Sequence, residues 1–121
     1  MNIFVWIVQA LLAVFFALHG VALVSPPDPI KAVFDALPFS RRFMVAIGIL
    51  EVLGAIGLIL PWALRIQPTL TPLAAAGLTI IMIGAIVTHL MRGEVLQAIP
   101  SLIITLLAAF VVYARTILVP H

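Results

Sequence analysis

The chain has 121 residues, of which 65% are hydrophobic and 8% are charged, and it carries a formal net charge of +2. Soluble domains carry about 25% charged residues, so this chain has too few polar side chains to coat a globule in water. The composition excludes a soluble globular protein and predicts an integral membrane protein that has the lipid bilayer as a partner and no nucleic-acid partner.

Four apolar runs have the length of a membrane-spanning helix, which is about 17 to 25 residues. They cover residues 3–24, 43–60, 73–90 and 99–119, and the nine prolines fall between these runs or at their edges. Proline breaks helix interiors, and a backbone in lipid must satisfy its own hydrogen bonds, which excludes open sheets. We therefore predict a single domain over residues 1–121, an all-α antiparallel bundle of four transmembrane helices.

The first connection predicts a short amphipathic helix over residues 30–37. Asp28 and Pro29 have the order of an N-cap and a first-turn residue, and Pro38 ends the segment. Apolar residues recur between them at helical spacing: Ile30, Val33, Phe34 and Leu37. Such a helix is expected to lie in the membrane interface, either packed on the end of the bundle or covering a lateral opening.

Glu51 is the only charged residue of the second run, about 12 Å from either end by helical rise. An ionised side chain there costs roughly 3 kcal/mol, and intramembrane acids are functional by default. The alternative is a neutral acid that serves helix association alone. We expect Glu51 to be protonated unless His19 pairs with it.

Small residues allow helices to approach closely in lipid, and several share the face of Glu51 or occupy the third run. The candidate packing residues are Gly48, Gly54, Ala55, Gly77 and Gly84. This pattern favours the third run as the close neighbour of the second and directs Glu51 into the bundle.

Two histidines approach the membrane face that bears the first connection, because the first and third runs have the same direction. His19 and His89 lie near the ends of those runs, and Phe15 and Phe16 offer a wall for a flat ring. The candidate ligand-binding residues are therefore Glu51, His19, His89, Phe15 and Phe16. Alternatively, His19 is a packing residue and His89 an interfacial one. Haem bound by the two histidines is disfavoured because their depths differ by about 6 Å.

Charge and aromatic residues suggest an orientation. Four of the six Lys and Arg residues flank the first and third connections, namely Lys31, Arg41, Arg42 and Arg92. This excess favours cytoplasmic first and third connections, with both termini outside. The aromatic residues Trp6, Trp62 and Tyr113 are expected to form a belt at the face that bears the termini.

Several segments resemble the DoxX-like membrane proteins. The segment GILEVLGAIGLILP at 48–61 resembles the second helix of that family, and TPLAAAGL at 71–78, MIGA at 82–85 and THL at 88–90, followed by RGE at 92–94, resemble the third. The resemblance implies a link to the membrane subunits of thiosulfate:quinone oxidoreductases, and eukaryotic relatives look similar to membrane chaperones of receptor assembly.

We therefore expect a protein of the bacterial inner membrane that binds a small lipophilic molecule, a quinone or a lipid, inside the bundle, as the membrane subunit of a redox system. The alternatives are a proton-coupled small-molecule transporter and a structural or assembly subunit. The sequence holds no cysteine and no self-contained catalytic motif, so we predict neither a catalytic residue nor a metal site. A redox role would require quinone or a partner protein, and the oligomer expected is a homodimer or a complex with that partner.

Overall fold

The computed structural model describes residues 2–67 and 69–118, and within them the chain is helical, without a strand. Four helices are long and apolar enough to cross a membrane: α1 (Asn2–Val24), α3 (Arg41–Leu64), α4 (Leu70–Met91) and α5 (Val95–Tyr113), the last continued by the π-helical turn η1 (Ala114–Leu118). These four apolar helices confirm the predicted all-α transmembrane architecture.

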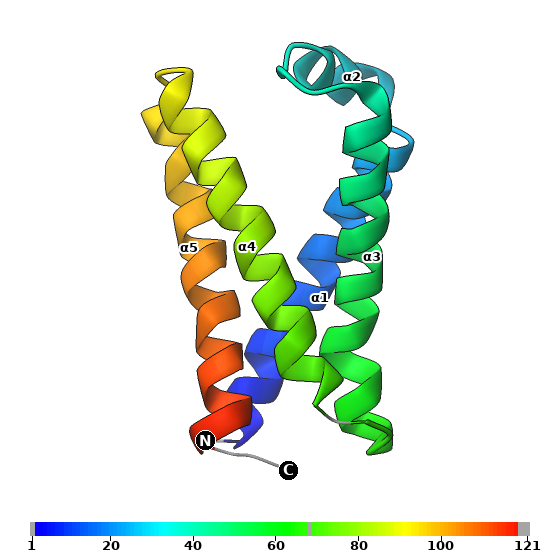
Figure 1. Ribbon diagram of the computed structural model, residues 1–121, viewed down its shortest axis with the longest axis vertical. Helices are drawn as coiled ribbons and strands as arrows, with labels where there is room; N and C mark the ends of the chain where they lie inside the picture. Colours follow the sequence, from blue (N-terminus) through cyan, green and yellow to red (C-terminus); the bar gives the residue numbers. More distant parts are fainter. Residues whose placement is uncertain (1, 68, 119–121) are drawn as a thin grey trace.

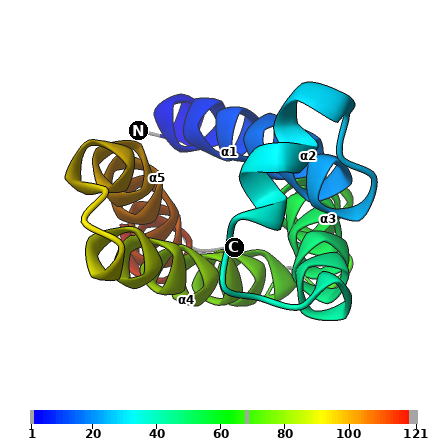
Figure 2. The same ribbon diagram turned by 90° about the horizontal axis from the view of Figure 1, so that it is seen from above.

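The long helices form two pairs. Successive long helices run in opposite directions along the vertical axis of Figure 1. Helix α1 packs mainly on α3, and α4 mainly on α5, whereas α3 and α4 make a smaller contact. The pairs meet at the end where α1 begins and diverge towards the other end, and Figure 2 shows the ribbons of the long helices arranged in a ring.

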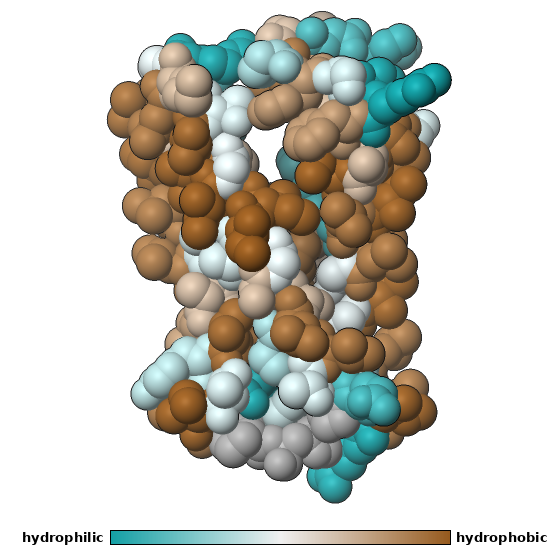
Figure 3. Space-filling model, in the orientation of Figure 1, coloured by the Kyte–Doolittle hydropathy of each residue, from teal (hydrophilic) through white to brown (hydrophobic). Residues whose placement is uncertain are grey.

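The divergence of the two helix pairs is visible on the space-filling surface. Between the two pairs, the upper half of the molecule in Figure 3 is hollowed. Hydrophobic residues form a broad band around the helices, and hydrophilic residues gather at the two ends (Figure 3). Large apolar side chains on all four helices are exposed along this band, as expected for helices that face lipid.

Two prolines lie inside helices, so the expectation that all nine stand between or beside the spans is wrong at these positions. Helix α3 continues through Pro61 to Leu64, and α5 begins at Val95, before Pro100. Pro61 has no N–H to donate to the carbonyl of Gly57 one turn earlier. That carbonyl instead accepts a hydrogen bond of 2.8 Å from the Thr71 hydroxyl of α4. A neighbouring helix therefore satisfies the group that Pro61 leaves free.

The first connection contains the short helix α2 (Asp28–Asp35), which lies over the ends of α1 and α3 in Figure 1. It begins two residues before the predicted segment 30–37, because Pro27 is its N-cap and Asp28 is already helical, and it ends two residues before that segment does, at Asp35. The side chain of Ile30 lies outside the described residues. That α2 lies at a membrane surface stays a prediction.

Arg41 ties α1 to α3 at this end of the molecule. Its Nη1 donates to the carbonyl of Leu23 at 2.8 Å, and its Nη2 donates to the carbonyl of Val24. A cation is favourable beside the last carbonyls of a helix, which lack partners within the helix. The Ser40 hydroxyl accepts from the Phe43 N–H and caps the start of α3. These contacts fix the connection next to the divergent end of the bundle.

Candidate functional site

The site centres on a contact between His19 of α1 and Glu51 of α3. His19 Nδ1 lies 2.7 Å from Glu51 Oε1. The Glu51 side chain is 2% exposed and the His19 side chain 39% exposed. Two acceptor atoms do not approach so closely without a hydrogen between them, so one of the two atoms carries a proton. The sequence-predicted partners are thus in direct contact, with the acid behind the imidazole.

Two glycines bring the helices of this pair together. A Cβ added at Gly20 would lie 2.6 Å from the carbonyl oxygen of Gly48, and one added at Gly48 would lie 2.6 Å from that of Gly20. Gly20 directly follows His19, and Gly48 lies one helical turn before Glu51. Because the two backbones touch here, the side chains of His19 and Glu51 come within hydrogen-bond distance of each other. Gly48 was among the predicted packing residues, and Gly20 was not.

Aromatic rings surround the His19 imidazole. Phe15 stacks on it with centroids 5.5 Å apart and planes at 11°. Phe34 of α2 meets it edge-on, with centroids 6.2 Å apart. Phe16 is fully buried in the core, and its ring centroid lies 5.0 Å from that of Phe15. Phe16 therefore supports the Phe15 ring from behind and does not line the site as expected. Phe34 was predicted only as part of the amphipathic helix, yet it reaches the site.

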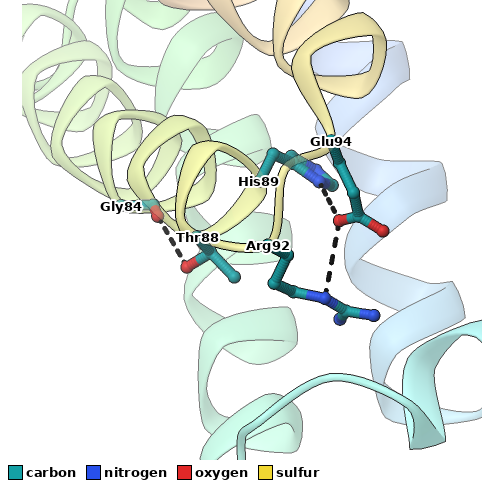
Figure 4. A network of polar contacts seen from close by, with 5 residues as sticks. All are labelled: Gly84, Thr88, His89, Arg92 and Glu94. Carbon is teal, nitrogen blue, oxygen red and sulfur yellow. Dashed lines mark hydrogen bonds and ion pairs between the residues drawn. The ribbon is translucent and has the colours of Figure 1, made fainter.

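His89 belongs to a different cluster, contrary to expectation. It lies in the last turn of α4, next to the connection to α5, and its Nδ1 lies 3.1 Å from Glu94 Oε1 (Figure 4). Arg92 Nε lies 3.6 Å from the same oxygen. Among the described residues, His89 makes no hydrogen bond or ion pair with Glu51. The physical reason is the packing of α4 on α5, which carries His89 away from α1 at the divergent end (Figure 1).

The other predicted packing residues separate into two groups. Ala55 is buried, and a Cβ at Gly54 would lie 2.8 Å from Leu78 of α4. By contrast, a Cβ at Gly77 or Gly84 would meet nothing within 4 Å. These two glycines therefore do not form the close contact that we expected of the third span, because α3 makes its closest approach to α1.

A second buried polar cluster surrounds Arg115 near the beginning of α1. Arg115 is 2% exposed; its Nε donates to Gln9 Oε1 at 2.6 Å and its Nη1 to Asn2 Oδ1 at 2.7 Å. Its guanidinium carbon lies 4.5 Å from the ring centroid of Trp62 and 5.4 Å from that of Trp6. Trp62 is buried and belongs to this cluster. Arg115 was expected only as a topology signal, and its place in a buried cluster was not predicted.

A planar guanidinium suits this cluster better than an ammonium does, because it donates in a fixed fork and stacks on aromatic faces. We expect Arg115→Lys to lower the free energy of unfolding by about 1–2 kcal/mol. The measurement is SDS-induced unfolding of detergent-solubilised protein, followed by circular dichroism. Arg65→Lys is the control. Because Arg65 is exposed, this variant should unfold at the same SDS concentration as wild type. Equal losses in both variants would contradict a specific role of the guanidinium.

The two polar clusters are separated by apolar packing. The largest fully buried apolar side chains include Leu12 and Phe16 of α1, Leu58 of α3 and Leu78 of α4. Leu12 lies between Gln9 and His19 on α1, and Leu58 lies beyond Glu51 on α3, towards the Arg115 cluster. The His19–Glu51 pair is therefore closed towards the Arg115 end and lies in the half of the molecule towards the divergent end of the helix pairs.

Comparison with known proteins places the chain in a family. The model of the DoxX-like family matches residues 7–111, from the early turns of α1 to the last turns of α5. Neither the curated proteins nor the solved structures contain a match. Because the match covers most of the sequence and all four apolar helices, the chain belongs to the DoxX-like family of membrane proteins.

Proposed function

We propose that the protein binds a small lipophilic molecule of the quinone class in the hollow between the two helix pairs, with His19 as its hydrogen-bond partner. The observation that carries this proposal is the 2.7 Å contact between His19 Nδ1 and Glu51 Oε1. This contact occupies one ring nitrogen. The other, Nε2, makes no hydrogen bond within residues 2–67 and 69–118, and it remains available to a ligand.

The His19–Glu51 pair suits a ligand with carbonyl or hydroxyl groups. With the proton on Nδ1, Nε2 is an acceptor for a hydroxyl; in the protonated ring, Nε2 donates to a carbonyl. The buried Glu51 carboxyl group orients the ring in either state and stabilises the charged imidazolium. The pair can thus hold a proton beside the ligand as a general acid or base.

The surroundings favour a flat apolar molecule. Phe15 and Phe34 border the imidazole on two sides, and the hollow in Figure 3 is flanked by hydrophobic residues. The apolar core between Glu51 and the Arg115 cluster supports binding over passage through the bundle, which the transporter alternative requires. The excess of Lys and Arg at the α2 end puts this end of the molecule at the cytoplasmic side in our proposal.

A redox role extends the same proposal. The chain has no cysteine. As the membrane subunit of a redox system, the protein would hold the quinone and its proton, while a partner protein exchanges the electrons. The structural-subunit alternative requires no ligand at His19, so ligand binding separates the two functions.

Titration of purified protein with decylubiquinone in mild detergent, by isothermal calorimetry, tests the proposal. We expect saturable binding by wild type and a roughly tenfold higher Kd for His19→Gln, the loss of about one hydrogen bond to an ionisable group. His89→Gln is the matched control, because His89 forms the other histidine–glutamate pair of the described residues, and its Kd should equal that of wild type.

Two results would contradict the proposal. If His19→Gln and His89→Gln bind as wild type does, the ligand is not at His19. If wild type shows no saturable binding and no lipophilic molecule co-purifies, the structural or assembly function is favoured instead.

A further inference from the structure

The outer face of the α1–α3 pair carries a shallow apolar groove of 290 Å³. It is lined by Val21, Val24, Ser25, Ile49, Val52 and Leu53. Two of these side chains flank the glycine contact: Val24 Cγ2 lies 3.0 Å from a Cβ built at Gly48, and Val52 Cγ2 lies 2.9 Å from one built at Gly20. The groove therefore follows the seam where the two helices touch.

Arg42 lies beyond the groove, towards the start of α3. It precedes Ile49 by seven residues and Leu53 by eleven, so the three residues share one face of α3. Arg42 is exposed and forms no hydrogen bond or ion pair with any residue in the described part of the chain. Arg41, by contrast, is engaged with the carbonyls of α1. One cation of this helix start is thus available to an anion.

Local electrostatics at Arg42 favour a negative group. Arg42 lies in the first turn of α3, where the helix dipole is positive and the first N–H groups lack carbonyl partners within the helix. A cation is unfavourable in this place unless an anion offsets it. An anion there would meet both the guanidinium and the positive end of the helix.

We propose that an anionic phospholipid binds on the outer face of the α1–α3 pair, with its phosphate at Arg42 and an acyl chain in the groove. Ile49 lies about 10 Å below Arg42 along the helix axis, so the apolar lining begins where the chain leaves the headgroup. Side chains on a helix lean towards its N-terminus, so a long cationic side chain at Arg42 can reach a headgroup at the start of α3. Cation and groove together match the two ends of one lipid molecule.

Native mass spectrometry of protein from nanodiscs of equal dioleoyl-phosphatidylglycerol and dioleoyl-phosphatidylcholine tests this inference. We expect wild type to retain phosphatidylglycerol preferentially, and Arg42→Gln to lower the ratio of retained anionic to zwitterionic lipid about fivefold, as expected for one basic residue at a membrane surface. Arg65→Gln removes another exposed cation, at the far end of α3, and should leave the ratio unchanged.

A second variant tests the groove itself. Leu53 is 58% exposed, so Leu53→Trp fills the groove without disturbing the core, and we expect it to reduce retention of both lipids. Equal effects of Arg42→Gln and Arg65→Gln would overturn the proposal in favour of unspecific charge attraction. A dimer that carries no lipid and dissociates in Leu53→Trp would overturn it in favour of a second copy in the groove.

Discussion

Gly48→Ala should lower the free energy of unfolding by about 3 kcal/mol, at the upper end of what overpacking of a core costs. The added methyl carbon would lie 2.6 Å from the carbonyl oxygen of Gly20 and 2.9 Å from Leu23 Cβ. Backbone atoms cannot rotate away as a flexible side chain can, so α1 and α3 must separate. The measurement is SDS-induced unfolding in mixed micelles, followed by circular dichroism.

Gly84→Ala is the matched control for this experiment. The same methyl carbon at Gly84 meets no atom within 4 Å, and alanine is a better helix former than glycine by about 1 kcal/mol. We therefore expect Gly84→Ala to be as stable as wild type or slightly more stable. If both variants lose the same stability, the contact between Gly20 and Gly48 does not hold the pair together. Separation of α1 from α3 should also weaken quinone binding in Gly48→Ala alone.

The membrane architecture follows from the sequence because lipid leaves few alternatives. Apolar runs of sufficient length must be helices there, and four such runs give the four apolar helices of the structure. Helix ends were less predictable. Pro61 was expected to end the second span, yet α3 continues to Leu64, because Thr71 of the following helix supplies a donor to the carbonyl of Gly57. Such compensation depends on a neighbour, which proline placement alone does not reveal.

Glu51 could be assigned to an interior site, because the free energy of exposing an ionisable side chain to lipid favours its burial beside a polar partner. His19 was the nearest candidate by depth, and the structure places it in contact with Glu51. The pairing of helices could not be derived, because small residues occur on both the first and third spans. The expected contact at Gly77 and Gly84 followed from taking the third span as the closest neighbour of the second. His89 was included because the first and third spans run in the same direction, which does not reveal that α4 packs mainly on α5.

Arg115 shows a different limit of sequence reasoning. A cation near a span end is usually read as a topology signal, and two tryptophans at the same depth as an interfacial belt. The structure joins them, with Gln9 accepting from the Arg115 Nε and donating to the carbonyl of Leu58. The signal that could have identified this cluster is the coincidence of a glutamine, an arginine and two tryptophans at one depth in three spans.

Glu51→Lys should be the most damaging single change at the candidate site. It removes the partner of His19 Nδ1 and buries a cation where the carboxyl group is 2% exposed. We expect a loss of about 3 kcal/mol or more in the free energy of unfolding, the cost of an uncompensated charge in such a place. The unfolding titration in SDS measures it, and decylubiquinone binding should be abolished in the folded fraction.

Glu94→Lys makes the same change in the other histidine–glutamate pair, whose carboxylate is 30% exposed, and should cost less than about 1 kcal/mol. Glu51→Gln should retain most of the stability, because its amide can still bond to Nδ1 while it can no longer exchange a proton. If Glu51→Gln is as unstable as Glu51→Lys, the pair requires a charged carboxylate for folding, and a site that alternates between protonation states is excluded. A stable Glu51→Gln that binds decylubiquinone more weakly than wild type supports a carboxyl group that acts on the ligand through the His19 ring.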